Sequence, residues 1–178
     1  KGFPGNPNVD IPRKYAGKLD VGAAVGRGLL TVSYDLGLKE PYSGQVEIQT
    51  GEVAEDLAYY FTVSEQLPSA VGLGVMVDTD SSVKYAGGFI LQLLPDAPED
   101  VIELLEKKLA NLEPVTAMME KGMTPEDMLS YIFEGVDIEF TERHDVEFYC
   151  DCSNEKVKRA LAAISDKELQ DIVNDGED

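Results

Sequence analysis

The sequence is poor in residues on which several protein classes depend. Its 178 residues include two cysteines, one histidine and no tryptophan. Two cysteines cannot build the disulfide framework of a small secreted domain, so we expect a reduced, cytoplasmic setting. A serine–histidine–aspartate triad would rest on His144 alone, and no other residues converge on a catalytic chemistry. We therefore expect that the protein is not an enzyme.

Long apolar runs and clustered basic residues are also missing. No stretch approaches the roughly 20 apolar residues of a membrane-spanning helix, and the chain does not open with a signal peptide. Lysine and arginine number 15 against 34 aspartates and glutamates, which gives a formal net charge of −19. Nucleic acids and anionic membrane surfaces bind proteins through clustered basic side chains. We therefore expect neither of them as a partner.

The negative charge is concentrated in the middle of the chain. Residues 1–95 and 150–178 each carry a net charge of −4, whereas residues 96–149, with 15 acidic and four basic side chains, carry −11. Together with the local patterns, this predicts an α+β protein with a β-rich core at 1–95, an acidic helical linker at 96–144 and a third part at 145–178. Because like charges weaken compact packing, we infer that the linker is marginally stable and depends on docking against the core.

Strand patterns dominate the first part. Apolar runs and alternation predict strands at 28–34, 45–49, 71–77 and 83–94. The last two form a hairpin around the turn 78–82. Apolar residues spaced by three and four predict an amphipathic helix over 52–67, which Pro68 stops. Gly87 and Gly88, inside the last strand, indicate a bulge or a close approach of the backbone.

Helical patterns dominate the rest of the chain. Helices are predicted after Pro98, from Val115 to Gly122, and after Thr124, which has the residue types of a helix start. An extended stretch at 145–150 precedes two short helices, of which the second begins with a capping box at Ser165 and Glu168. Met118, Met119, Met123 and Met128 are expected to fill the core or, alternatively, to form an adaptable surface.

The sharpest local feature is Cys150-Asp151-Cys152. On an extended backbone, residues two apart point to the same side, so the two sulfurs suit two ligands of one tetrahedral thiolate site. A disulfide between them is also possible, although it would be strained and reducible. Alternatively, the cysteines are unrelated and pack as small apolar side chains. His144 is a conceivable third ligand, but a lone histidine beside charged neighbours is more often a surface residue.

Four segments, in their order along the chain, resemble one known family. They are Tyr42-Ser43-Gly44-Gln45-Val46; Tyr59-Tyr60-Phe61 followed by Ser64-Glu65-Gln66-Leu67-Pro68; Ala86-Gly87-Gly88-Phe89-Ile90-Leu91-Gln92; and Asp145-Val146-Glu147-Phe148 leading into Cys150, Cys152 and Ser153. The combination resembles the redox-regulated bacterial holdase family often called the 33 kDa chaperonin. The resemblance covers the whole chain.

The resemblance implies a β-rich core, a helical linker and a small C-terminal zinc domain, of which residues 145–178 would be the first part. In the family, a C-x-C pair and a later C-x-x-C pair bind zinc, and oxidation forms a disulfide within each pair and releases the metal. The resemblance assigns Cys150 and Cys152 to the first pair, as zinc ligands and as a redox-active disulfide. It also implies ATP-independent binding of unfolding client proteins, typically by a homodimer. The alternative is an acidic structural or dimerisation module with an incidental cysteine pair.

The sequence departs from the family pattern at both ends. The C-x-x-C pair, expected a few residues after Asp178, is absent, and so is the part of the core that precedes the position of Lys1. We therefore expect an incomplete chain, in which zinc would not be fully ligated by the residues present.

Overall fold

The computed structural model describes residues 10–11, 14–15, 18–34, 37, 42–147 and 153–175. The chain divides into two compact units, Lys1–Glu139 and Phe140–Asp178. The described part contains antiparallel strand pairs and several helices, which confirms the α+β class. The three-part division of the chain stays a prediction.

A two-stranded antiparallel ribbon follows the short helix α1 (Val21–Val25). Its strands are β1 (Leu29–Tyr34) and β2 (Tyr42–Glu47). The first strand confirms the prediction, but the second begins and ends earlier than the predicted range 45–49. The backbone leaves the ribbon at Gln49 because its N–H donates to the Asp56 carboxylate, 2.9 Å away.

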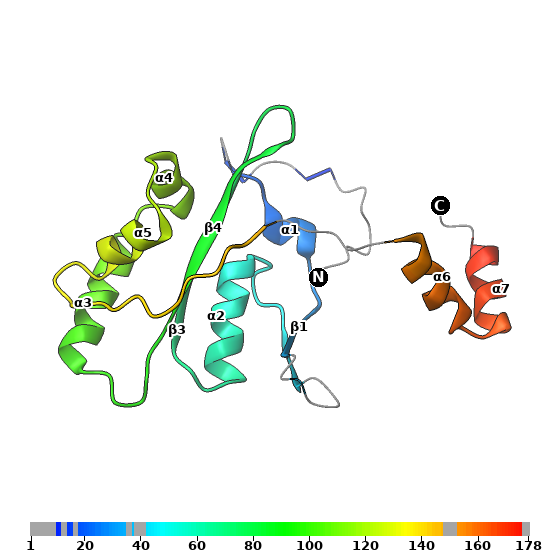
Figure 1. Ribbon diagram of the computed structural model, residues 1–178, viewed down its shortest axis with the longest axis horizontal. Coiled ribbons are helices and arrows are strands. Elements are labelled where there is room, and N and C mark those ends of the chain that lie inside the picture. Colours follow the sequence, from blue (N-terminus) through cyan, green and yellow to red (C-terminus); the bar gives the residue numbers. More distant parts are fainter. Residues whose placement is uncertain are drawn as a thin grey trace. The chain divides into compact units, whose positions relative to one another are not determined.

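Helix α2 (Val53–Val63) lies between this ribbon and strand β3 (Figure 1). It is shorter than the predicted 52–67. Ser64 is its C-cap, and Gln66 has a positive φ of 58°, a left-handed conformation that does not continue a right-handed helix. The buried Asp56 carboxylate in its first turn accepts three backbone N–H groups, from Gln49, Thr50 and Gly51. These bonds hold the turn that leads from β2 into the helix.

Strands β3 (Ser69–Val77) and β4 (Val83–Gln92) form the long hairpin of Figure 1, as predicted. Its register shifts between Met76 and Val77, so the bulge does not lie at the glycines of β4. The glycines serve a close approach instead. A Cβ atom at Gly87 would lie 2.9 Å from the Met119 sulfur, and one at Gly88 would lie 2.4 Å from the carbonyl oxygen of Gly72.

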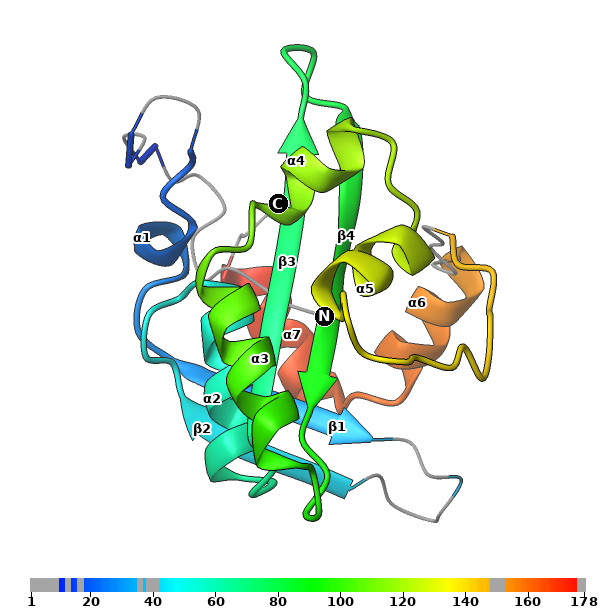
Figure 2. The same ribbon diagram turned by 90° about the vertical axis from the view of Figure 1, so that its left-hand side faces the viewer.

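Three short helices follow the hairpin and lie in front of it in Figure 2: α3 (Glu99–Ala110), α4 (Val115–Glu120) and α5 (Pro125–Ile132). All three agree with the prediction, and Thr124 and Asp127 form a capping box at the start of α5. Helix α4 packs on both strands of the hairpin. One buried cluster joins these elements, formed by Val115, Met118 and Met128 with the partly buried Phe89, Leu112, Met119 and Met123. The four methionines are therefore core residues.

The second unit contains helices α6 (Asn154–Ala162) and α7 (Asp166–Asp175). The Ser153 hydroxyl caps α6 by accepting the N–H of Lys156, and Ser165 and Glu168 form the predicted capping box before α7. Residues 140–147 have no regular secondary structure, and the rest of the predicted extended stretch, 148–150, lies outside the described residues. Among the described helices, none combines the length and apolar character needed to cross a membrane.

Candidate functional site

The predicted zinc and disulfide residues, Cys150 and Cys152, lie outside the described residues. Their assignment therefore stays a prediction. The chemistry of the donor set supports it only in part, because a structural zinc site takes four ligands and the chain contains two thiols. In the described ranges, no group of three or more histidine, cysteine, aspartate or glutamate residues could hold a metal ion.

His144 is a surface residue. Its side chain is 78% exposed, and its Nε2 atom lies 3.0 Å from a carboxylate oxygen of Glu142. It stands in a stretch without regular structure. The structure thus supports the surface interpretation of this histidine.

An open apolar groove of about 830 Å³ is a feature that the sequence did not predict. It lies between α3 and the end of the hairpin where β3 begins and β4 ends. Its lining consists of Pro68, Ser69, Ala70, Ile90, Leu91, Gln92, Leu93, Leu94, Pro95, Asp96, Ala97, Pro98, Val101, Ile102, Leu105, Glu106, Leu109 and Phe133. Leu94 is 76% exposed and Ile90 is 50% exposed. Exposed apolar side chains gathered in one place are typical of binding surfaces.

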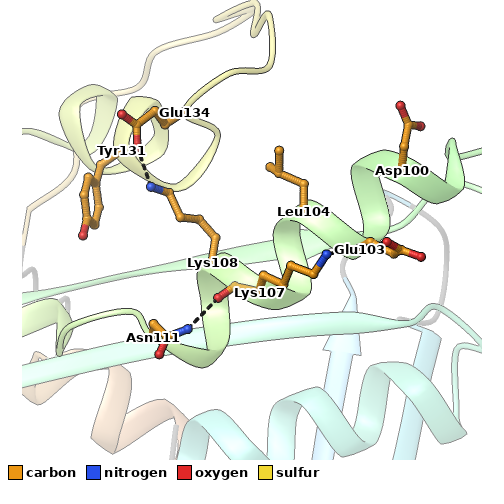
Figure 3. A pocket seen from close by; sticks show the side chains of 8 residues that line it. All are labelled: Asp100, Glu103, Leu104, Lys107, Lys108, Asn111, Tyr131 and Glu134. Carbon is orange, nitrogen blue, oxygen red and sulfur yellow. Dashed lines mark hydrogen bonds and ion pairs between the residues drawn. The ribbon is translucent and has the colours of Figure 1, made fainter.

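The opposite side of α3 borders a polar pocket of about 640 Å³ (Figure 3). Here the Lys108 ammonium donates to a carboxylate oxygen of Glu134, 2.5 Å away, and lies 4.9 Å from the centre of the Tyr131 ring. We call these three residues the Lys108 clasp. The hydrogen bond raises the pKa of Lys108 and lowers the pKa of Glu134. The clasp adds a charged contact between α3 and the C-terminal end of α5.

A buried phenol joins two of the segments on which the family resemblance rests. Tyr60 is fully buried, and its hydroxyl donates to a carboxylate oxygen of Glu65 at 2.5 Å. Burial and this hydrogen bond raise the pKa of Tyr60 to about 12. Gly44 of β2 leaves the space that the ring occupies, since a Cβ atom there would lie 2.5 Å from the Tyr60 oxygen. No sequence pattern connects these residues, so only the fold reveals their contact.

The comparisons with known proteins agree with this architecture. A family model described as "Hsp33 protein" matches residues 1–178. Proteins named "33 kDa chaperonin" from Agathobacter rectalis and Clostridium botulinum are 56% and 55% identical to the chain, each over 99% of its length. The chain covers 62% and 60% of these two relatives, so it spans about three fifths of the length of the curated proteins it matches.

A solved structure supports the same assignment. The crystal structure of the 33 kDa chaperonin from Thermotoga maritima superimposes with a TM-score of 0.79 at 44% sequence identity. The match covers 97% of this chain and 59% of that one. The family model spans every residue, and the sequence relatives and the structural neighbour agree with it. The chain therefore belongs to the Hsp33 family.

Proposed function

We propose that the protein containing this chain is an ATP-independent molecular chaperone that holds unfolding proteins during oxidative stress. The relatives carry the name chaperonin, which supports a chaperone. Among the structural features, the open apolar groove beside α3 carries the proposal. A holdase needs apolar surface to which exposed apolar segments of clients can bind, because burial of such surface is the main driving force of association. The proposed activity is the binding of unfolding client proteins and involves no catalysed reaction.

The proposed switch includes Cys150 and Cys152, with two further thiolates supplied from outside these 178 residues. Zinc, when bound to four thiolates, contributes folding free energy to a small domain. Thiolates are also the groups that oxidants attack. Oxidation of the Cys150 and Cys152 thiolates by one molecule of hydrogen peroxide would form one sulfur–sulfur bond, break the oxygen–oxygen bond and, with two protons from the solvent, give two water molecules. The cysteines would then no longer be available as ligands.

The helices α3 to α5 supply the element that loss of the zinc domain would loosen. They contain 12, 6 and 8 residues, and such short helices rarely persist without tertiary packing. Their stability depends on the buried apolar residues through which they pack on one another and on the hairpin, and the segment carries a high negative charge. When these helices loosen, the apolar side chains between Val101 and Leu112 become available to clients. We further propose that the active protein is a homodimer in the cytoplasm.

Hydrogen exchange of the full-length protein during peroxide titration tests this mechanism. We expect amides of residues 97–135 to lose protection as suppression of client aggregation appears. Protection that persists in this range while activity rises would contradict the mechanism.

Two further measurements separate the proposal from the alternative of an acidic structural or dimerisation module. One tightly bound zinc per full-length chain, lost on oxidation, supports the chaperone switch, whereas a protein without zinc supports the alternative. The 178-residue chain is the matched control, because it lacks the second thiol pair. It should not respond to peroxide as a four-thiol switch, and a strong zinc-dependent, reversible response from this chain would contradict the assignment.

A further inference from the structure

We propose that the methionines between α4, α5 and the hairpin form a second oxidation site, separate from the cysteines. We call Met118, Met119, Met123 and Met128 the methionine cluster. Conversion of their thioethers to sulfoxides shifts the docking equilibrium of α4 and α5 toward the undocked state. The chemistry depends on the cluster alone, whereas its consequence for client binding rests on the proposed chaperone function.

The sulfur atoms of the methionines are concentrated at this contact. Four of the five methionines stand in the segment that forms α4, α5 and the turn between them. Met118 and Met128 are buried, whereas Met119 and Met123 are only partly buried. A small oxidant can therefore reach two of the sulfurs while the helices are docked, and all four once the helices loosen.

The backbone of the same residues closes the turn from α4 to α5. The Met118 carbonyl oxygen accepts the N–H of Met123 at 3.2 Å, and the Met119 carbonyl oxygen accepts the N–H of Gly122 at 2.9 Å. The Met119 sulfur also lies against β4, because a Cβ atom at Gly87 would be 2.9 Å from it. A change at these side chains therefore acts on the turn and on the contact with the hairpin.

Hydrogen peroxide is the oxidant in this step. The thioether sulfur gives an electron pair to one peroxide oxygen, and the oxygen–oxygen bond breaks. The sulfoxide forms, and the other oxygen leaves as water after taking the proton of the transferred hydroxyl. The sulfur is oxidised by two electrons, and the peroxide is reduced.

The added oxygen changes the balance between the docked and the undocked helices. A thioether packs as an apolar side chain, whereas a sulfoxide is polar. In the undocked state water hydrogen-bonds the sulfoxide oxygen, but the docked cluster surrounds it with apolar neighbours such as Leu112, Val115 and Phe89. Burial of a polar group without a hydrogen-bond partner costs free energy. Each sulfoxide therefore favours the undocked state.

The modification outlasts the proposed cysteine switch. Reduction of the disulfides and return of zinc would restore the resting state of that switch. Methionine sulfoxides, by contrast, are reversed by two dedicated reductases, one for each epimer of the sulfoxide. Oxidised methionines would therefore keep α4 and α5 undocked after the thiols are reduced.

The test follows the zinc-bound full-length protein through oxidation and recovery. The protein is treated first with hydrogen peroxide and then with dithiothreitol and zinc. Mass spectrometry measures the oxygen added at each methionine, and hydrogen exchange follows the amides of residues 115–132. We expect sulfoxides in the cluster and amide exchange that stays roughly tenfold faster than before oxidation. Treatment with both sulfoxide reductases should restore the original exchange rates.

A variant without the four sulfurs provides the comparison. The fourfold variant Met118→Leu/Met119→Leu/Met123→Leu/Met128→Leu keeps apolar side chains of similar volume. It should regain full protection after dithiothreitol and zinc. Met76→Leu is the matched control, because Met76 of β3 is not part of the cluster. This control should recover as incompletely as the original protein.

Three results would overturn the inference. The first is a cluster without sulfoxide at peroxide concentrations that oxidise the cysteines. The second is full recovery of protection while the sulfoxides are still present. The third is a fourfold variant that recovers no better than the original protein. If the fourfold variant does not fold, the reductases decide, because protection that stays lost after they remove the oxygen contradicts the inference.

Suppression of client aggregation, measured on the same samples, separates this inference from the proposed function. If the oxidised protein suppresses aggregation but regains full protection with dithiothreitol and zinc, the chaperone function stands and the methionine site fails. If sulfoxides and lost protection persist but no sample suppresses aggregation, the methionine site stands and the proposed function fails.

Discussion

At the scale of single residues, α2 contains two buried side chains that form hydrogen bonds, Asp56 and Tyr60. Asp56 collects three backbone N–H groups, and Tyr60 donates to Glu65 while its ring fills the space above Gly44. Both residues fix the helix to the ribbon formed by β1 and β2. A buried polar group of this kind costs stability when its partner is removed, because the remaining group loses water without gaining a hydrogen bond.

The first prediction concerns Tyr60→Phe. The substitution keeps the buried ring and removes the hydroxyl that donates to Glu65. We expect the free energy of unfolding to fall by about 1–3 kcal/mol, measured by urea denaturation. Tyr59→Phe is the matched control, since Tyr59 is 38% exposed, and it should unfold at nearly the same urea concentration as the original chain. Equal midpoints for Tyr60→Phe and the control would show that the bond contributes little.

At the scale of elements, α4 docks where glycines of the hairpin allow a close approach. A Cβ atom at Gly74 would lie 3.0 Å from the backbone nitrogen of Thr116 and 2.9 Å from its Cγ2 atom. At Gly87, by contrast, the nearest atom is the sulfur of Met119, which belongs to a flexible side chain. At Gly74 the neighbour includes the backbone of α4, which can move away only if the whole helix shifts.

This difference leads to the second prediction. Gly74→Ala should displace α4 and cost about 1–3 kcal/mol of stability, together with faster hydrogen exchange of the α4 amides. Gly87→Ala serves as the comparison and should have a smaller effect, because Met119 can change its rotamer. If both variants lose protection in α4 to the same extent, the close approach at Gly74 does not control docking.

The third prediction concerns the Lys108 clasp between α3 and α5. Lys108→Met keeps the length of the side chain and removes the charge that Glu134 and Tyr131 contact. Because the pair is exposed, we expect hydrogen exchange in α5 to accelerate only roughly two- to fivefold, with no change in the β3–β4 hairpin. Lys107→Met is the control, since Lys107 pairs with Glu103 of its own helix.

The clasp also has a defined pH dependence. The hydrogen bond from Lys108 lowers the pKa of Glu134, so its contribution is complete above the carboxyl pKa of the unfolded chain, about 4.3. It is lost as pH falls through the lower pKa of the folded state. The difference in exchange between Lys108→Met and the original chain should therefore be present at neutral pH and vanish in strong acid. A difference that grows on acidification would contradict this assignment.

At the scale of the whole molecule, the net charge of −19 is the dominant physical property. Charges of one sign repel each other more in the compact state than in the unfolded state, and salt screens this repulsion. The fourth prediction follows. Raising the salt concentration from about 10 mM to about 150 mM shortens the screening length from about 30 Å to about 8 Å. The urea midpoint of the chain should therefore rise.

A charge-reduced variant provides the control for this prediction. It replaces exposed glutamates of the segment 96–139 by glutamine, at Glu99, Glu103, Glu120 and Glu139. Its midpoint should depend less on salt than that of the original chain. If the urea midpoints of both proteins depended equally on salt, the repulsion would come from charges other than these four glutamates.

Most elements of the fold followed from the sequence, because the signals for them are local. The period of apolar residues, the prolines after α2 and before α3, and the capping residues Thr124 and Ser165 all act within a few positions of one another. The errors lie at element ends. Helix α2 ends before the left-handed Gln66, which could not continue it, and β2 ends before Gln49, whose N–H donates to Asp56, seven residues away. A contact between residues that are several positions apart leaves no periodic pattern of apolar residues from which it could be predicted.

The sequence by itself determined the α+β class, the order of the elements, the concentration of acidic residues in one segment and the spacing of the thiol pair. The tertiary structure alone decided which of these residues meet. Lys108 and Glu134 are 26 positions apart, and Gly44 approaches Tyr60 from another element. The groove between α3 and the hairpin likewise exists only because α3 lies beside one end of the hairpin in the folded chain. Such contacts depend on how complementary surfaces pack, and packing is a property of the folded chain rather than of any segment within it.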